Sequence, residues 1–204
     1  MARICVFCAS SERIDPVHVE LGYAVGREIA RRGHDLVWGG ASVGTMGSVA
    51  RGVRDGGRHT LGVIPEVMLP MEVADADADE LVVTVDMRER KGRMDVAADG
   101  FLALPGGIGT LEELLEIWVG ATIGLHTKPV VVLDPSGVYA PLHELVERLV
   151  GQGFVRPEAA RAVAWERDVM EALDTLESGI EAPPLSRRGP APADAVEEIL
   201  EAEP

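Results

Sequence analysis

The sequence predicts an α/β fold, a doubly wound parallel sheet flanked by helices and contained in a single domain. Short apolar runs typical of buried strands alternate along the chain with segments whose apolar residues recur at helical spacing. Successive runs are separated by enough residues for a crossover helix, which parallel strands require. The 204 residues, 47% of them hydrophobic, suffice to bury one core.

Seven strands are expected in chain order, at residues 3–8, 36–38, 59–64, 81–85, 100–104, 129–133 and 162–165. Helices are expected at 15–33, from the turn at 39–47 to about 57, from 86 onward, and at 111–118, 139–150 and 169–176. The first helix shows both end signals, since Asp15 and Pro16 are typical of a helix start and Gly33 of a helix end. We assign residues 1–180 to the domain and expect the proline-rich, acidic segment 181–204 to form a flexible tail.

Two of the strands end in glycine-rich turns that open helices, at residues 39–47 and 104–110. Such a turn directs backbone N–H groups and the positive end of a helix at one place, which favours a phosphate or carboxylate ligand there. In the second turn the glycines permit close approach of an anion, and the Thr110 hydroxyl can cap the helix or donate to the anion. Glu113 follows close behind, where a carboxylate can cap the helix or take part in chemistry. The glycine spacing matches neither a P-loop nor the dinucleotide-binding fingerprint.

Charge and composition exclude several classes of function. The formal net charge of −15 argues against a nucleic-acid or anionic-membrane partner, and no apolar run is long enough to span a bilayer. Because the chain enters a strand at once, without a signal-peptide pattern, we expect a cytoplasmic protein. Cys5 and Cys8 lie in one strand and point to opposite faces, which favours two buried thiols over a disulfide. No cluster has metal-ligand spacing, so neither a metal nor another cofactor is expected.

Four cations lie within six residues on the helix expected from residue 86, namely Arg88, Arg90, Lys91 and Arg93. Ligands of parallel sheets lie beyond the carboxyl ends of the strands, where both glycine turns and this basic segment would converge. An anion site with a carboxylate beside it fits hydrolysis of a phosphorylated sugar derivative, because the carboxylate stabilises a cationic, oxocarbenium-like state. By contrast, we interpret the alternating acids of residues 74–80 as a solvated loop and His126 as a helix-end cap.

The motifs also resemble those of one enzyme family. Residues 105–113 read Pro-Gly-Gly-Ile-Gly-Thr-Leu-Glu-Glu, the pattern PGGxGTxxE, and residues 87–91 read Met-Arg-Glu-Arg-Lys, its companion motif. Residues 5–11 and 39–47 look like two earlier signatures of the same family. Together, over roughly residues 1–180, the chain resembles the Lonely Guy family of cytokinin riboside 5′-monophosphate phosphoribohydrolases, often described as lysine decarboxylase-like.

The resemblance implies a Rossmann-like homodimer that hydrolyses the N-glycosidic bond of adenosine 5′-monophosphate (AMP) and its N6-modified relatives. The products would be the free base and ribose 5-phosphate, so the implied partner is a small nucleoside monophosphate. Arg90 and Glu113 are the implied catalytic pair. The implied substrate-binding residues are Glu72, Lys91, Gly106, Gly107, Ile108, Gly109, Thr110, Leu111 and Glu112.

The chain departs from the family pattern just after these motifs. Where the family commonly reads Ile-Thr-Trp-Ala-Gln, residues 118–122 read Trp-Val-Gly-Ala-Thr. The difference affects a polar contact that the resemblance implies at residue 119, and it affects the shape of the base pocket. No lysine stands as an anchor for pyridoxal phosphate, so decarboxylation has no support in the residues. The alternative is a non-catalytic binding protein on the same scaffold, such as the similar molybdenum-cofactor carriers. Glu113 with Arg90 favours the enzyme, because a carrier needs the anion site but no carboxylate beside it.

Overall fold

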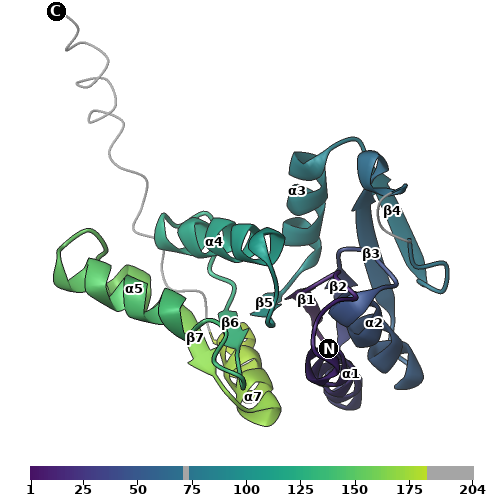
Figure 1. Ribbon diagram of the computed structural model, residues 1–204, viewed down its shortest axis with the longest axis horizontal. Helices are drawn as coiled ribbons and strands as arrows, with labels where there is room; N and C mark the ends of the chain where they lie inside the picture. The colour runs from purple at the N-terminus through teal and green to yellow at the C-terminus, as the bar shows by residue number, and fades with distance from the viewer. Residues whose placement is uncertain (71–73, 183–204) are drawn as a thin grey trace, which may run out of the picture.

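The computed structural model describes residues 1–70 and 74–182, which form a central parallel sheet covered by helices (Figure 1). The strands are β1 (Arg3–Phe7), β2 (Asp35–Trp38), β3 (Thr60–Pro65), β4 (Glu80–Thr84), β5 (Gly100–Ala103), β6 (Val130–Leu133) and β7 (Val163–Glu166). The helices are α1 (Pro16–Arg31), α2 (Gly44–Asp55), the 3₁₀ helix η1 (Glu66–Met68), α3 (Met87–Ala97), α4 (Ile108–Thr122), α5 (Ala140–Gly151), α6 (Pro157–Ala160) and α7 (Val169–Glu181). Every pairing between these strands is parallel, which confirms the predicted fold class.

The strand order, β4-β3-β2-β1-β5-β6-β7, places a reversal between β1 and β5. The chain builds outward from β1 to β4 and then returns through α3 to pair β5 on the other side of β1. In sheets of this kind the loops on either side of the reversal diverge, and a crevice opens at the carboxyl ends of the two strands. One glycine-rich turn leaves β5, at this reversal, and the other leaves β2, which is separated from it by β1.

Each face of the sheet has its own core. One core packs strand residues against α1, α2 and α7, as Val25 illustrates, and the other packs them against α3, α4 and α5, as Met94 illustrates. Figure 1 shows the two groups of helices on opposite sides of the strands. Cys8 belongs to the first core and Cys5 to the second, and both thiols are free and buried. The expectation that the two cysteines point to opposite faces is confirmed.

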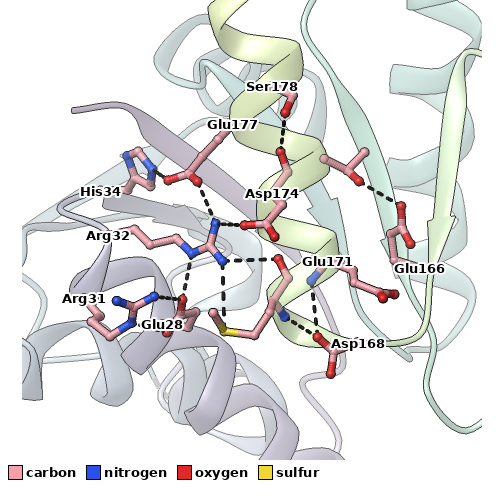
Figure 2. Close-up of polar contacts among 12 residues, drawn as sticks. Glu28, Arg31, Arg32, His34, Glu166, Asp168, Glu171, Asp174, Glu177 and Ser178 are labelled. Atoms are coloured by element: carbon pink, nitrogen blue, oxygen red, sulfur yellow. Dashed lines mark hydrogen bonds and ion pairs between the residues drawn. The ribbon is translucent and has the colours of Figure 1, made fainter.

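A polar clamp joins the end of α1 to α7 at the amino edge of the sheet (Figure 2). The guanidinium of Arg32 donates to Glu28 on its own helix at 2.7 Å and to Asp174 and Glu177 on α7 at 2.6 Å each. His34 lies beside them, because its Nε2 contacts Glu177 at 2.7 Å while its Nδ1 accepts from the N–H of Ala2 at 3.1 Å. The clamp therefore holds α7 in place on the side of the molecule remote from the carboxyl edge.

The acidic loop before β4 is only in part the solvated segment that the sequence predicts, since Asp77, Asp79 and Glu80 are exposed. Asp75 is buried, its N–H donates to the Gly40 carbonyl at 2.9 Å, and its carboxylate pairs with Arg54 at 3.0 Å. Asp79 accepts hydrogen bonds from both the N–H and the hydroxyl of Thr60. The prediction was therefore wrong for Asp75, whose burial is compensated by its partner on α2, and it holds for the three exposed acids.

Other differences lie near the end of the described chain. The short α6 was not expected, and α7 continues to Glu181 instead of ending at residue 176. Glu72 and residues 183–204 lie outside the described residues, so the expectations for that acid and for most of the tail remain predictions. A search of the described residues finds no helix with the length and apolar character that crossing a membrane requires.

Candidate active site

Arg90 reaches the carboxyl edge of the sheet from α3. The carboxylate of Asp86 caps this helix, accepting from the N–H groups of Arg88 at 2.9 Å and Glu89 at 2.8 Å. The helix so positioned directs Arg90 inward, where only 3% of the residue is exposed. Its Nε donates to the carbonyl oxygen of Val63 on β3 at 3.0 Å, which fixes the guanidinium against the sheet.

Glu113 of α4 meets this guanidinium. Nη1 of Arg90 donates to Oε1 of Glu113 at 2.7 Å, and the two side chains are 4% and 5% exposed. Removing one partner from a buried ion pair leaves an uncompensated charge, at a cost of about 3–5 kcal/mol. The pair therefore holds a carboxylate in a defined position beside the strand reversal.

Gly39, directly after β2, makes room for the arginine. A Cβ atom at this position would lie 2.3 Å from Nη2 of Arg90 and 3.0 Å from the Met46 methyl carbon. No side chain fits there while Arg90 keeps its place. The first glycine-rich turn thus contributes to the site by leaving space for Arg90.

That turn does not form the open anion site that the sequence predicts. Gly44 has a φ of +58°, and a Cβ there would lie 2.8–2.9 Å from backbone atoms of Ala9, Ser10 and Ser11. The N–H of Met46, in the first turn of α2, donates to the Ala9 carbonyl at 3.1 Å. The loop after β1 consequently covers the amino end of α2.

The second glycine-rich turn is open. Gly107, the N-cap of α4, has no side chain with which to cap the helix, and Gly107, Ile108 and Gly109 are exposed. The first N–H groups of a helix have no partner within it, so this end offers donors and a positive dipole to an anion. Thr110 packs over Gly106, where a Cβ would lie 2.2 Å from the Thr110 hydroxyl oxygen.

Tyr139 supports this turn through hydrogen bonds to backbone carbonyl groups. Its hydroxyl lies 3.1 Å from the carbonyl oxygen of Leu104 and 3.3 Å from that of Gly106, and it donates to this pair of acceptors. Asp134 in turn accepts from the N–H of Tyr139 at 2.7 Å and so positions the ring. Burial raises the pKa of the Tyr139 hydroxyl, which keeps it a donor. The turn therefore has a rigid base although its tip is exposed.

The basic segment does not act as one patch. Lys91 forms ion pairs with Glu112 and Glu116, the second at 2.6 Å, and so joins α3 to α4. Arg90 is buried, as described above, and the other two arginines of the segment are exposed. Two of the four cations thus lie near the site, and both already have carboxylate partners.

The structure brings most of the candidate residues to one edge. Arg90, Glu113 and the turn at 106–110 lie there together. Leu111 packs against a core cluster, which leaves its backbone as the part near the turn, and Glu112 is exposed beside Lys91. Sequence reasoning missed two supports of the site. Gly39 was noticed for the wrong reason, and Tyr139 carries no local signal, because its contacts lie 33 and 35 positions away.

Other reactive side chains nearby have structural partners. His126 contacts the Ile117 carbonyl of α4 through Nε2 at 2.9 Å and accepts from the N–H of Lys128 through Nδ1 at 3.2 Å, so its ring joins the helix to the segment that follows it. Burial, with the Glu113 carboxylate, raises the pKa values of Cys5 and Cys8, so both remain thiols. No group of three His, Cys, Asp or Glu side chains within the described ranges could hold a metal ion.

Solved structures share this fold at low sequence identity. The molybdenum cofactor carrier protein of Chlamydomonas reinhardtii superposes with a TM-score of 0.66 at 22% identity, covering 89% of this chain and 99% of that one. The molybdenum cofactor binding protein of Rippkaea orientalis gives 0.65 at 23% identity, over 87% and 96%. Likeness at this level of identity establishes the fold and no more.

Sequence relatives are much nearer. The model of the family described as "Possible lysine decarboxylase" matches residues 46–176. Cytokinin riboside 5′-monophosphate phosphoribohydrolase LOG7 of Arabidopsis thaliana is 44% identical over 175 residues, which cover 86% of this chain and 81% of the relative. The corresponding enzyme LOG of Oryza sativa subsp. japonica is also 44% identical, over 86% and 72%. The chain therefore belongs to the Lonely Guy family of phosphoribohydrolases, as its motifs indicated.

Proposed function

We propose that the chain is an N-glycosidase that hydrolyses adenine-type nucleoside 5′-monophosphates, AMP and N6-modified relatives, to the free base and ribose 5-phosphate. The observation that carries the proposal is the buried Arg90–Glu113 pair beside the open amino end of α4. The open amino end of α4 suits the phosphate, and the Glu113 carboxylate suits the reacting sugar carbon. The names of the two sequence relatives described above support the same reaction.

The turn at 106–110 would hold the phosphate through backbone N–H groups and the helix dipole. This contact places the ribose so that its anomeric carbon faces Glu113. As the bond from that carbon to the base nitrogen breaks, its electron pair leaves with the base, which takes up a proton. The sugar acquires oxocarbenium character, and the Glu113 carboxylate stabilises the positive charge. Water then forms the new bond to carbon and loses its proton, for which Glu113 is the nearby acceptor.

Arg90 has two parts in this scheme. Its guanidinium compensates the Glu113 charge before the substrate arrives, which makes a buried carboxylate tolerable. The hydrogen bond to Val63 fixes the guanidinium, and the guanidinium fixes the Glu113 carboxylate. The carboxylate therefore does not have to reorganise during the reaction.

Decarboxylation of lysine, which the family description mentions, finds no support among the side chains. That chemistry in its pyridoxal-phosphate form needs a lysine amine that forms a Schiff base. The sequence has two lysines, and their ammonium groups pair with carboxylates, Lys91 with Glu112 and Glu116 and Lys128 with Asp95. A carrier role on this scaffold needs the anion site but does not require the buried Arg90–Glu113 pair beside it.

The proposal includes a homodimer. Ile108, Leu115, Val119 and Ile123 recur at helical spacing along α4 and are at least 44% exposed, and Phe154 is 77% exposed across a shared groove. An apolar face of this kind is typical of a subunit interface. Sedimentation should give a dimer for the wild type and a monomer for Ile123→Glu. A monomeric, fully active wild type would contradict this part of the proposal.

The direct test incubates purified protein with AMP and with N6-isopentenyl-AMP and measures free base and ribose 5-phosphate. We expect the two products in equal amounts, and base release abolished by Glu113→Gln. Release of no base from either nucleotide would contradict the proposed reaction and return the carrier role to consideration.

A further inference from the structure

The direction of the Gly106–Gly107 peptide is set by a side chain outside the turn. The hydroxyl of Tyr139 donates to the carbonyl oxygens of Leu104, at 3.1 Å, and Gly106, at 3.3 Å. The peptide is trans, and in a trans peptide the C=O and the following N–H point in opposite directions. Because the Gly106 carbonyl faces the buried tyrosine, the N–H of Gly107 faces the exposed side of the turn.

The sequence of the turn does not by itself choose this direction. Glycine lies on both sides of the peptide, and glycine adopts backbone conformations that other residues disfavour, so the reversed peptide is sterically allowed. In the reversed orientation the Gly106 carbonyl oxygen, which carries a partial negative charge, would face the anion and repel it. The other peptide that the tyrosine holds, between Leu104 and Pro105, has no N–H to offer. The Gly107 N–H is therefore the donor whose direction depends on Tyr139.

Gly107 is placed to give this donor to a ligand. Within the described part of the chain its N–H donates to no other group, while its carbonyl accepts from the N–H of Leu111 at 3.0 Å. Gly107 is also the N-cap of α4, so the positive end of the helix dipole lies at the same place. The N–H thus combines exposure with the most favourable local potential for an anion.

Tyr139 is held in place independently of the turn. The residue is 3% exposed and belongs to the core that covers one face of the sheet. Asp134, directly after β6, accepts from the N–H groups of Val138 at 3.0 Å and Tyr139 at 2.7 Å. Because β6 is an interior strand of the sheet, these bonds tie the tyrosine to the sheet and not to the exposed turn.

We propose that Tyr139 is a positioning residue for the substrate phosphate, because its hydroxyl holds the Gly106 carbonyl and so directs the Gly107 N–H at a phosphate oxygen. The inference rests on the proposed function, which places the 5′-phosphate at this turn. The tyrosine touches no reacting atom and acts only through the peptide. It should therefore affect ligands that carry the phosphate and leave those without it almost unchanged.

The test replaces Tyr139 with phenylalanine, which removes the hydroxyl and keeps the ring. Calorimetry should show that ribose 5-phosphate binds Tyr139→Phe about tenfold or more weakly than the wild type, because a hydrogen bond to a charged group is lost. The kcat/KM for AMP should fall by a similar factor, whereas that for adenosine should change by less than about twofold. Tyr23→Phe is the matched control. It removes the hydrogen bond from a tyrosine hydroxyl on α1 to Asp55, 2.8 Å long, and should leave all three quantities unchanged.

The amide proton of Gly107 reports the positioning directly. In the nuclear magnetic resonance spectrum of the wild type, saturating ribose 5-phosphate should move this resonance downfield, because the N–H then donates to a charged oxygen. The displacement should be much smaller in Tyr139→Phe and unaltered in Tyr23→Phe. A structural defect remote from the turn would not produce this difference.

Ribose 5-phosphate cannot undergo the reaction, so its binding separates this inference from the proposed function. Weakened binding in Tyr139→Phe but not in Tyr23→Phe supports the positioning role even if the wild type cleaves no nucleotide, in which case the proposed reaction alone fails. Unchanged binding in Tyr139→Phe, or a wild type that binds no ribose 5-phosphate, would overturn the positioning role while AMP hydrolysis stands. Equal losses of kcat/KM for AMP and adenosine, or equal losses in the two variants, would overturn it as well, because a general distortion affects every ligand.

Discussion

The guanidinium of Arg90 and a side chain at residue 39 would occupy the same space, since a Cβ on Gly39 would lie 2.3 Å from Nη2 of Arg90. The arginine has no easy way to move aside, because its Nε is bonded to Val63 and its Nη1 to Glu113. A glycine after β2 is therefore coupled, through Arg90, to the position of a carboxylate on α4. The geometry of the proposed catalytic pair depends on this absence of a methyl group.

Gly39→Ala should accordingly lower kcat by about tenfold to a hundredfold, because displacing a reacting group by ~1 Å costs that much. The overpacking should lower the free energy of unfolding by about 1–3 kcal/mol, so the variant remains folded. Steady-state kinetics and urea unfolding measure the two effects. Gly151→Ala is the matched control, since a Cβ there meets no atom within 4 Å. Unchanged kcat in Gly39→Ala would mean that Arg90 tolerates displacement.

Much of the fold could be predicted because its signals are local. Asp15 and Pro16 mark the start of α1, and alternating apolar runs and glycine turns locate the strands and indicate that they are parallel. Within the acidic loop Asp75 was mispredicted, because its burial depends on Arg54, a partner on another element. Composition alone cannot show which acids find such partners.

That the candidate site residues lie together was predictable to a similar extent and for a similar reason. Glu113 could be found because it follows a glycine turn at a fixed offset, and Arg90 because its motif precedes that turn. The supports of the site arise only in three dimensions. Tyr139, at the start of α5, contacts the turn only in the folded chain, and the need for a glycine at residue 39 follows only from the position of Arg90 on α3.

Glu113→Gln should reduce kcat by about a hundredfold or more, because the amide cannot stabilise a developing positive charge as a carboxylate does. The buried Arg90 would also lose its counter-charge, so we expect the free energy of unfolding to fall by up to ~3–5 kcal/mol. Kinetics on the folded fraction and denaturant unfolding report the two effects separately. Glu147→Gln, an exposed acid on α5, should change neither quantity. Full turnover by Glu113→Gln would show that the carboxylate is structural.

The clamp between α1 and α7 should make stability depend on pH through Glu28. The hydrogen bond from Arg31, together with those from Arg32, lowers the pKa of Glu28 from 4.5 to about 2. A carboxylate with a lowered pKa contributes stability above its unfolded value, and that contribution is lost as the pH falls from about 4.5 towards 2. Glu28→Gln should therefore cost up to ~3 kcal/mol at pH 7, at 1.36 kcal/mol per pKa unit, and almost nothing near pH 2. Urea unfolding across this range measures the difference, with the exposed Glu20→Gln on the same helix as control. A cost that is independent of pH would refute the assignment.

Activity should require the 5′-phosphate of the substrate, so adenosine should be hydrolysed far more slowly than AMP. With a net charge of −15 the protein repels anions at long range, and a phosphate is admitted only where local donors outweigh that field. The donors available are the N–H groups at the open end of α4, which Tyr139 holds in place through the Leu104 and Gly106 carbonyls. Hydrogen bonds to a charged group contribute on the order of 1.5–3 kcal/mol each. Losing two or more would lower kcat/KM by about two to four powers of ten, at 1.36 kcal/mol per tenfold.

Lys91→Ala should have a smaller effect than removal of the phosphate, because Glu112 and Glu116 already neutralise that ammonium group. The measurement is kcat/KM for AMP and adenosine in the wild type and in Lys91→Ala. Comparable values for the two substrates would place the phosphate away from the turn and make the glycines a purely structural element.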